Sequence, residues 1–123
     1  MKTLLALTLA SLALLGCSDD DMSADCRADL ECRAQTFMVT ADLLCKERVE
    51  KLAKSDLKWD RSRDMPLLSG YEWKDKAKGT ITYSGDKARI RMPTGKYATE
   101  RYECDIDPDN KTAPVLDVRV TTE

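Results

Sequence analysis

The spacing of apolar residues changes near the middle of the chain, and this change sets the limits of the fold. Between residues 25 and 54, which contain no Gly or Pro, apolar residues recur every three or four positions, as on one face of a helix. From Tyr71 onward they alternate with polar residues, as in strands that bury one side. Helical sequence followed by strands predicts an α+β fold, with an N-terminal helix or helix pair packed on an antiparallel β-meander of four to five strands.

The helical part leaves two arrangements open. Asp25 and Asp42 are both suitable N-terminal caps, so the pattern allows one long helix, or a short helix over residues 25–34 followed by a longer one over residues 40–54. The opposite face of the helix is charged and is expected to contact solvent. The apolar stripe consists of Met38, Ala41, Cys45, Val49 and Leu52.

Turn-forming residues divide the strand part. Gly, Pro, Asp and Asn predict turns at residues 78–79, 84–86, 93–96 and 107–110. Residues 55–70, which include Pro66, are expected to form a connecting loop. The apolar face of the predicted sheet comprises Tyr71, Trp73, Ile81, Tyr83, Ala88, Ile90, Met92, Tyr102, Cys104, Ile106, Leu116, Val118 and Val120.

The first 17 residues have the parts of an export signal. Lys2 provides a positive head, residues 4–15 form an apolar run, and a small residue precedes Cys17. The run is too short for a membrane span, which takes about 18 or more apolar residues. The segment Leu14-Leu15-Gly16-Cys17 resembles the lipobox of bacterial lipoproteins. The resemblance implies that the thiol of Cys17 carries diacylglycerol and that cleavage leaves Cys17 as an acylated first residue.

The same resemblance implies a division of the chain into three parts. It implies a lipoprotein signal peptide over residues 1–16, an acylated flexible tether over residues 17–24 and a single small domain over residues 25–123. In this family an Asp after the cysteine tends to retain the protein at the inner membrane, whereas here the residue is Ser18. We therefore expect a lipid anchor in the outer membrane of a Gram-negative cell, with the domain facing the periplasm or the cell surface. An ordinary secretory signal ending at a chance cysteine is the alternative.

Four cysteines remain once Cys17 is set aside, and an even number in an exported chain predicts two disulfides. Cys45 lies on the helical stripe and Cys104 on the apolar face of a strand, so we expect them to pair across the core. Cys26 and Cys32 are then the second pair, and their separation of six residues requires an interruption of the helix between them. A four-cysteine metal site is less favoured because the chain has no Cys-x-x-Cys spacing.

Composition excludes several functions. The chain has no histidine, which rules out Ser-His-Asp and Cys-His catalysis and any zinc site that needs imidazole. With 20 basic and 22 acidic residues it has no excess of positive charge for nucleic acid. The acidic run at residues 105–110 begins like a calcium loop but lacks its Gly and its bidentate Glu, so we expect a turn. No cofactor, metal or nucleic-acid partner is predicted.

Beyond the signal peptide, the chain resembles a group of small exported bacterial proteins, and this resemblance implies no activity. It rests on Cys45, residues 50–53, Trp59, Trp73, residues 79–83, residues 85–87, residues 102–105 and residues 116–118. We predict a non-catalytic protein-interaction module of the cell envelope, such as an inhibitor, an exclusion or immunity factor or an assembly accessory, with an envelope protein as its partner. The alternative is a hydrolase that acts on cell-wall material with carboxylates alone.

Overall fold

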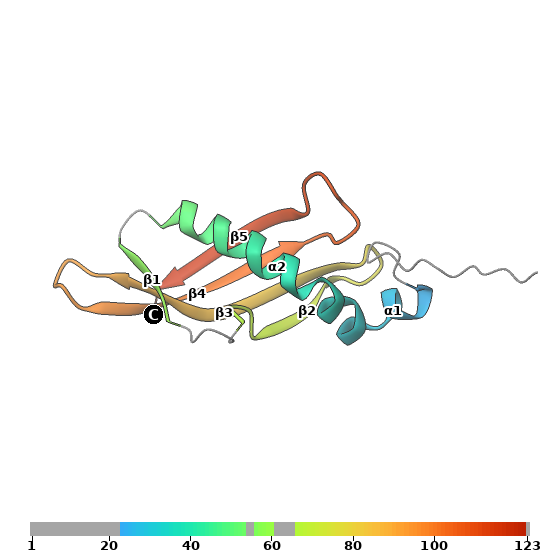
Figure 1. Ribbon diagram of the computed structural model, residues 1–123, viewed down its shortest axis with the longest axis horizontal. Coiled ribbons are helices and arrows are strands. Elements are labelled where there is room, and N and C mark those ends of the chain that lie inside the picture. The colour runs from blue at the N-terminus through green and yellow to red at the C-terminus, as the bar shows by residue number, and fades with distance from the viewer. Residues whose placement is uncertain (1–22, 54–55, 61–65, 123) are drawn as a thin grey trace, which may run out of the picture.

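A single layer of helix covers one face of an antiparallel sheet in the computed structural model, which describes residues 23–53, 56–60 and 66–122 (Figure 1). This is the α+β arrangement that the sequence predicts. No helix in the described ranges is long and apolar enough to cross a membrane. The elements are α1 (Ala24–Ala28), α2 (Leu30–Leu52), β1 (Leu57–Trp59), β2 (Gly70–Asp75), β3 (Thr80–Arg91), β4 (Tyr97–Ile106) and β5 (Val115–Thr122).

Asp29 separates α1 from α2. It has an extended backbone conformation, and its carboxylate accepts a hydrogen bond from the backbone N–H of Glu31 at 3.1 Å, which caps the start of α2. The break brings the Cα atoms of Cys26 and Cys32 to 5.1 Å. The predicted interruption of the helix between these two cysteines is therefore confirmed.

The second helix does not begin near residue 40, as one of the two predicted arrangements had it. α2 continues through this region without a break. Asp42, predicted as a possible cap, instead accepts a hydrogen bond from the backbone N–H of Leu67 at 3.1 Å. Its carboxylate thus attaches the chain before β2 to the middle of the helix.

β3 is the central strand of the sheet. β4 pairs along one side of β3, and β5 pairs with β4 at the edge. On the other side, β1 pairs with the second half of β3 and β2 with the first half, so β1 and β2 lie along the same edge. β1 was not predicted, because residues 57–59 were expected to belong to a loop. It places Trp59 against Tyr102, with ring centroids 5.7 Å apart.

The predicted turn at residues 84–86 is wrong, because β3 continues through it with a β-bulge. The register shifts between Gly85 and Ala88, where β3 has one residue more than β4. In a regular strand, an odd-numbered and an even-numbered residue such as Tyr83 and Ala88 would point to opposite faces of the sheet. The extra residue shifts this alternation, so that both are buried in the core beside α2. A Cβ at Gly85 would collide with the carbonyl oxygen of Leu67 and lie 2.6 Å from the ring of Tyr102, so only glycine fits.

The core lies between α2 and the sheet. Tyr83 is fully buried, and its hydroxyl donates to the carbonyl of Ala34 in α2 at 2.8 Å. Burial raises the pKa of Tyr83. Trp73 is half-buried against the same cluster. The buried apolar residues of this cluster are Ala34, Ala41, Cys45, Val49, Leu68, Ile81, Tyr83, Ala88, Tyr102, Cys104 and Ile106.

Two residues expected in the core are exposed instead. Leu116 is 46% exposed, because the pairing of β4 with β5 shifts beside Ile106 and Val115 takes the inward position. Leu52 is the last residue of α2 and is also exposed. Neither a regular alternation nor a helical stripe in the sequence indicates where a bulge lies or where a helix or strand ends.

Arg33 ties the helix to two turns. It is only 1% exposed, although it carries a full charge. Its Nε donates to the carbonyl of Gly79 in the β2–β3 turn at 2.8 Å, and its Nη2 pairs with Asp109 in the β4–β5 turn at 3.2 Å. Both turns are thereby held against the N-terminal half of α2.

Candidate functional site

Four of the five cysteines singled out in the sequence form two disulfides. Cys26 is bonded to Cys32, and we call this bond the N-terminal disulfide. Cys45 of α2 is bonded to Cys104 of β4 across the core, with Cα atoms 6.0 Å apart, and we call this bond the helix–sheet disulfide. These are the pairs predicted from the sequence. Cys17, the predicted lipidation site, lies outside the described residues.

The face of the sheet that points away from α2, here called the outer face, carries a charged network around Asp105. The side chain of Asp105 is only 1% exposed. Arg119 donates to both of its carboxylate oxygens, at 2.8 and 3.0 Å, and Thr82 donates at 2.7 Å. Lys74 lies 3.3 Å away. The hydrogen bonds from Arg119 are the largest cause that lowers the pKa of Asp105, which falls to about 2.

Arg119 also joins the surrounding carboxylates. Its Nη1 lies 3.0 Å from Asp117, and its Nε lies 3.2 Å from Glu103. The hydrogen bonds to Asp105 raise the pKa of Arg119. Asp105 and Asp117 are directly opposite on β4 and β5, and Arg119 neutralises this like-charged pair. This half of the outer face is therefore a fixed, internally compensated network.

A polar hollow of about 340 Å³ lies beside the network. Its lining includes Glu72 on β2, Ser84 on β3 and Glu103 on β4. Two carboxylates near a hydroxyl group are the elements that a carboxylate-dependent hydrolase would use. Glu103, however, already accepts a hydrogen bond from Arg119 at 3.2 Å, so one of its carboxylate oxygens is engaged within the charged network.

The other half of the outer face is cationic. Lys58 and Arg89 occupy directly opposite positions on β1 and β3. The ammonium of Lys58 lies 4.9 Å from the ring centroid of Tyr97, and Arg89 pairs with Asp60 at 2.8 Å. Arg91 makes no ion pair within the part of the chain that the structure describes. We call Lys58, Arg89, Arg91, Lys96 and Tyr97 the basic tip.

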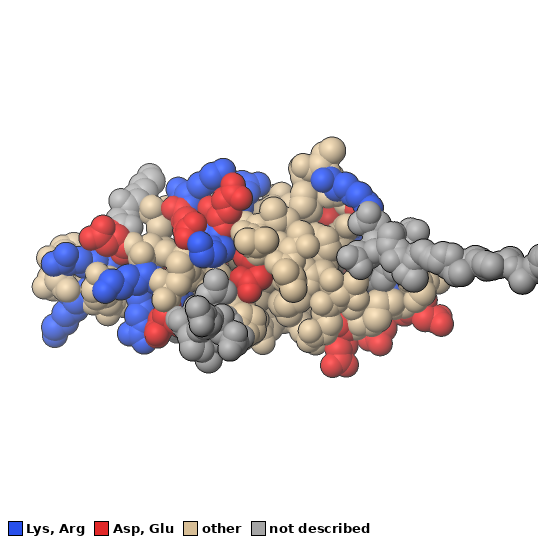
Figure 2. All heavy atoms as spheres, in the orientation of Figure 1, with Lys and Arg blue, Asp and Glu red and all other residues tan. Residues whose placement is uncertain are grey.

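The basic tip lies at one end of the long axis, where the β3–β4 hairpin extends past the C-terminal end of α2 (Figure 1). Lys and Arg side chains gather over this end of the molecule in Figure 2. Like charges placed directly opposite on a sheet destabilise it, by up to about 1 kcal/mol. Tyr97 and Asp60 offset part of this cost at Lys58 and Arg89, whereas Arg91 has no ion pair among the described residues.

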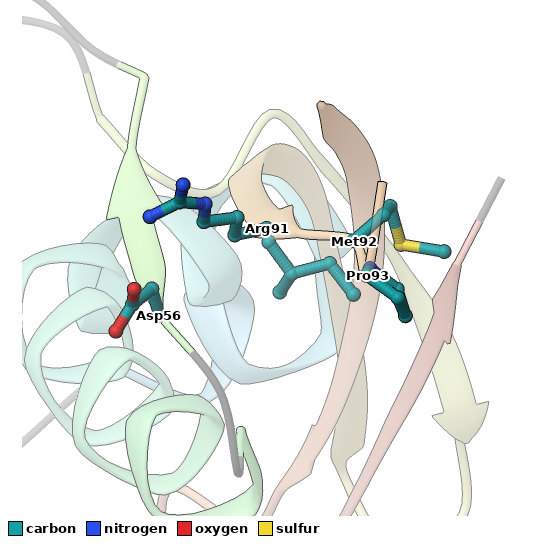
Figure 3. Close-up of a pocket in the computed structure, with 5 residues that line it drawn as sticks. Asp56, Arg91, Met92 and Pro93 are labelled. Atoms are coloured by element: carbon teal, nitrogen blue, oxygen red, sulfur yellow. The ribbon is translucent and has the colours of Figure 1, made fainter. Parts of the chain in front are cut away.

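A shallow hollow of about 540 Å³ lies beside the basic tip. Figure 3 shows Arg91 extending toward the side where Asp56 lies, with Met92 and Pro93 on the other side. Ile90 also lines the hollow. The tip thus offers a depression lined by apolar residues and Arg91, and arginine and methionine are both enriched at protein interfaces.

The sequence contained only part of this site. The alternation of Arg89 and Arg91 with apolar residues predicted a charged outer side for β3, without distinguishing it from ordinary solvent surface. Lys58 had no signal, because β1 was not predicted. The burial of Asp105 was also missed, since alternation alone would have left a carboxylate on that face in solvent.

Comparison with known proteins adds no family to this description. No protein-family model matches the chain, and neither the curated proteins nor the solved structures contain a match. In the described ranges, no group of three or more His, Cys, Asp or Glu side chains is placed to hold a metal ion.

Proposed function

We propose that the protein is a lipoprotein, anchored in the outer membrane by lipid on Cys17, that binds another protein of the cell envelope without catalysing a reaction. The observation that carries the proposal is the basic tip, where Lys58 and Arg89 lie directly opposite each other and Arg91 has no ion pair among the described residues. A partner with an acidic surface would relieve this repulsion on binding.

The adjoining hollow supplies what charge alone does not. Charges at the rim of an interface mainly raise the association rate and exclude wrong partners. Affinity comes chiefly from apolar or aromatic side chains that enter pockets at the centre. The hollow at Ile90 and Met92 can accept such a side chain, while Arg91 lies at its rim. We therefore expect a partner that carries an apolar residue surrounded by carboxylates.

The position of the tip supports the same interpretation. The described chain begins at α1, at the end of the long axis opposite the β3–β4 hairpin (Figure 1). A lipid on Cys17 would attach the membrane at the α1 end. The basic tip would then be the part of the domain farthest from the membrane and accessible to a partner in the periplasm or at the surface.

Site-specific photocrosslinking in cells tests the docking surface. A photoreactive residue in place of Tyr97 should form one adduct with an envelope protein, and the same residue in place of Glu47, exposed on α2, should form none. Arg89→Glu combined with Arg91→Glu should abolish the adduct while the melting temperature stays within a few degrees. Equal adducts from both positions, or an adduct that survives the charge reversal, would contradict docking at the tip.

The anchor has its own test. Cys17→Ser should prevent acylation, and after a high-salt wash it should release the protein from the membrane fraction, because the wash removes electrostatic contacts but not a lipid anchor. A Cys17→Ser protein that still incorporates labelled fatty acid, or that still floats with membranes after the high-salt wash, would refute the lipoprotein assignment.

The hydrolase alternative is favoured only by the polar hollow that contains Glu72 and Glu103. It predicts release of soluble fragments from purified cell wall, and loss of this release in Glu72→Gln. Turnover that depends on Glu72 would replace the non-catalytic proposal.

A further inference from the structure

A second cationic feature lies at the opposite end of the molecule, where the described chain begins. It is a cleft of about 310 Å³ between α1, the start of α2, the β2–β3 turn and the β4–β5 turn. In Figure 1 α1 and the β2–β3 turn lie at the end of the long axis opposite the β3–β4 hairpin. The side chains that line the cleft include Arg27, Arg33, Lys76, Lys78 and Asp109.

The charges in this cleft are not balanced. Four cations face one carboxylate, Asp109, whose two oxygens are already engaged by Arg27 at 3.5 Å and by Arg33 at 3.2 Å. Lys76 and Lys78 make no ion pair with any residue that the structure describes. Asp25, Asp29 and Glu31 belong to the same end of the molecule but do not line the cleft. The cleft can therefore accept an anion between the two lysines and Arg27.

The cleft is built before any ligand arrives. Arg33 forms its buried floor and is fixed by the carbonyl of Gly79. Gly79 has a φ of 72°, and a Cβ there would lie 2.9 Å from the Arg33 guanidinium, so the turn depends on glycine. The N-terminal disulfide fixes α1, and with it Arg27, against α2. Arg27 and Arg33 are thus held in place before binding, and the side-chain entropy lost on binding comes mainly from Lys76 and Lys78.

We infer that this cleft binds the phosphate of an anionic phospholipid headgroup and thereby orients the domain on its membrane. The inference rests on the proposed lipid anchor at Cys17. Ala24 at the edge of the cleft is seven residues beyond Cys17, and a fully extended segment of that length spans at most about 25 Å. The anchor would thus hold the cleft within reach of the headgroups. Lysines are suited to this role because they bind phosphate as mobile point charges.

Headgroup contact would give the two ends of the domain separate tasks. With the cleft on the membrane, the long axis stands away from the surface and the basic tip is directed toward the partner (Figure 1). Without it, a lipid anchor alone would leave the tip free to approach the same membrane.

Vesicle flotation of the full mature chain carrying Cys17→Ser tests the inference, because this chain has no lipid of its own and retains the acidic residues Asp19–Asp21. We expect binding to vesicles of phosphatidylcholine and phosphatidylglycerol at 3:1, and none to phosphatidylcholine alone. Removing one charge near an anionic surface weakens binding about fivefold, so Lys76→Gln with Lys78→Gln should weaken it about 25-fold. The matched control, Arg48→Gln with Lys51→Gln on α2, should change it less than about twofold.

The same chain distinguishes the sources of phosphate. If millimolar inorganic phosphate shifts the amide NMR signals of residues 76–79 while vesicles containing phosphatidylglycerol do not bind, the cleft serves a soluble phosphate compound and the headgroup assignment fails. Equal weakening by the cleft and control variants would show diffuse charge attraction and also overturn it. Because the probe lacks lipid, these results are independent of Cys17 acylation and of crosslinking at the tip.

Discussion

Replacing Asp105 with Asn tests the physical account of the outer face. Asp105 has an ordinary pKa of 3.8, and hydrogen bonds from Arg119 lower its pKa to about 2 in the folded protein. A difference of this size corresponds to about 2 kcal/mol of folding free energy at neutral pH, allowing for the partial exposure of Arg119 and Lys74. Asp105→Asn should therefore lower the free energy of unfolding at pH 7 by about this amount.

The sign of the pH dependence follows from the lowered pKa. Because the carboxyl of Asp105 binds protons more weakly in the folded state, its stabilising effect is complete above its unfolded pKa of about 4 and is lost as the pH falls toward 2. The difference in unfolding free energy between the wild type and Asp105→Asn should consequently shrink between about pH 4 and pH 2.

Urea unfolding of both proteins at pH 7, 4 and 2.5 measures this difference. Asp117→Asn is the matched control, because its side chain is 62% exposed and pairs with the same arginine. It should change stability by less than about 0.5 kcal/mol at every pH. A difference between wild type and Asp105→Asn that stays constant from pH 7 to 2.5 would refute the ionised, paired state of Asp105.

Removing the helix–sheet disulfide by double alanine substitution should cost about 4 kcal/mol in urea unfolding, against about 2 kcal/mol for the N-terminal disulfide, because it closes a much longer loop; equal losses would contradict this entropic account. Tyr83→Phe should lower stability by about 1 kcal/mol and Tyr83→Ala by about 3 to 5 kcal/mol, since only the second leaves a cavity. Trp73 is only half-buried, so Trp73→Ala should lower the free energy of unfolding less than Tyr83→Ala does, as measured by urea unfolding. An equal decrease would show that Trp73 is fully buried in solution. Gly85→Ala should cost about 3 kcal/mol through its collision with Leu67, whereas Gly95→Ala, with open space around it, should cost about 1 kcal/mol for its positive φ.

The large features of the fold could be predicted because they follow from repeated spacing. A helical stripe and five apolar alternations require two layers, and Cys45 and Cys104 lie on the faces that meet. The predictions failed where one extra residue shifts the alternation of inward and outward side chains along a strand. Apolar positions change from odd at Tyr83 to even at Ala88, and this change is compatible with either a turn or a bulge. Only the pairing with β4 decides between them.

The candidate sites were harder to predict because they depend on contacts between distant segments. Arg33 looks like any charged residue of a helix, and its burial follows from two turns more than 40 residues away. β1 is three residues long and exists only because β3 offers it an edge. Lys58 therefore belongs to the basic tip because β1 pairs with β3, and no local sequence pattern predicts that strand pairing.

The two disulfides also make the structure depend on the redox state of its surroundings. Together they account for about 6 kcal/mol, whereas a domain of this size has a total stability of only about 5 to 15 kcal/mol. A thiol-reducing environment would therefore remove a large part of this stability, and the fully stabilised fold requires an oxidant. The bond between Cys45 and Cys104 thus links the time at which the chain becomes fully stable to the redox state of its surroundings.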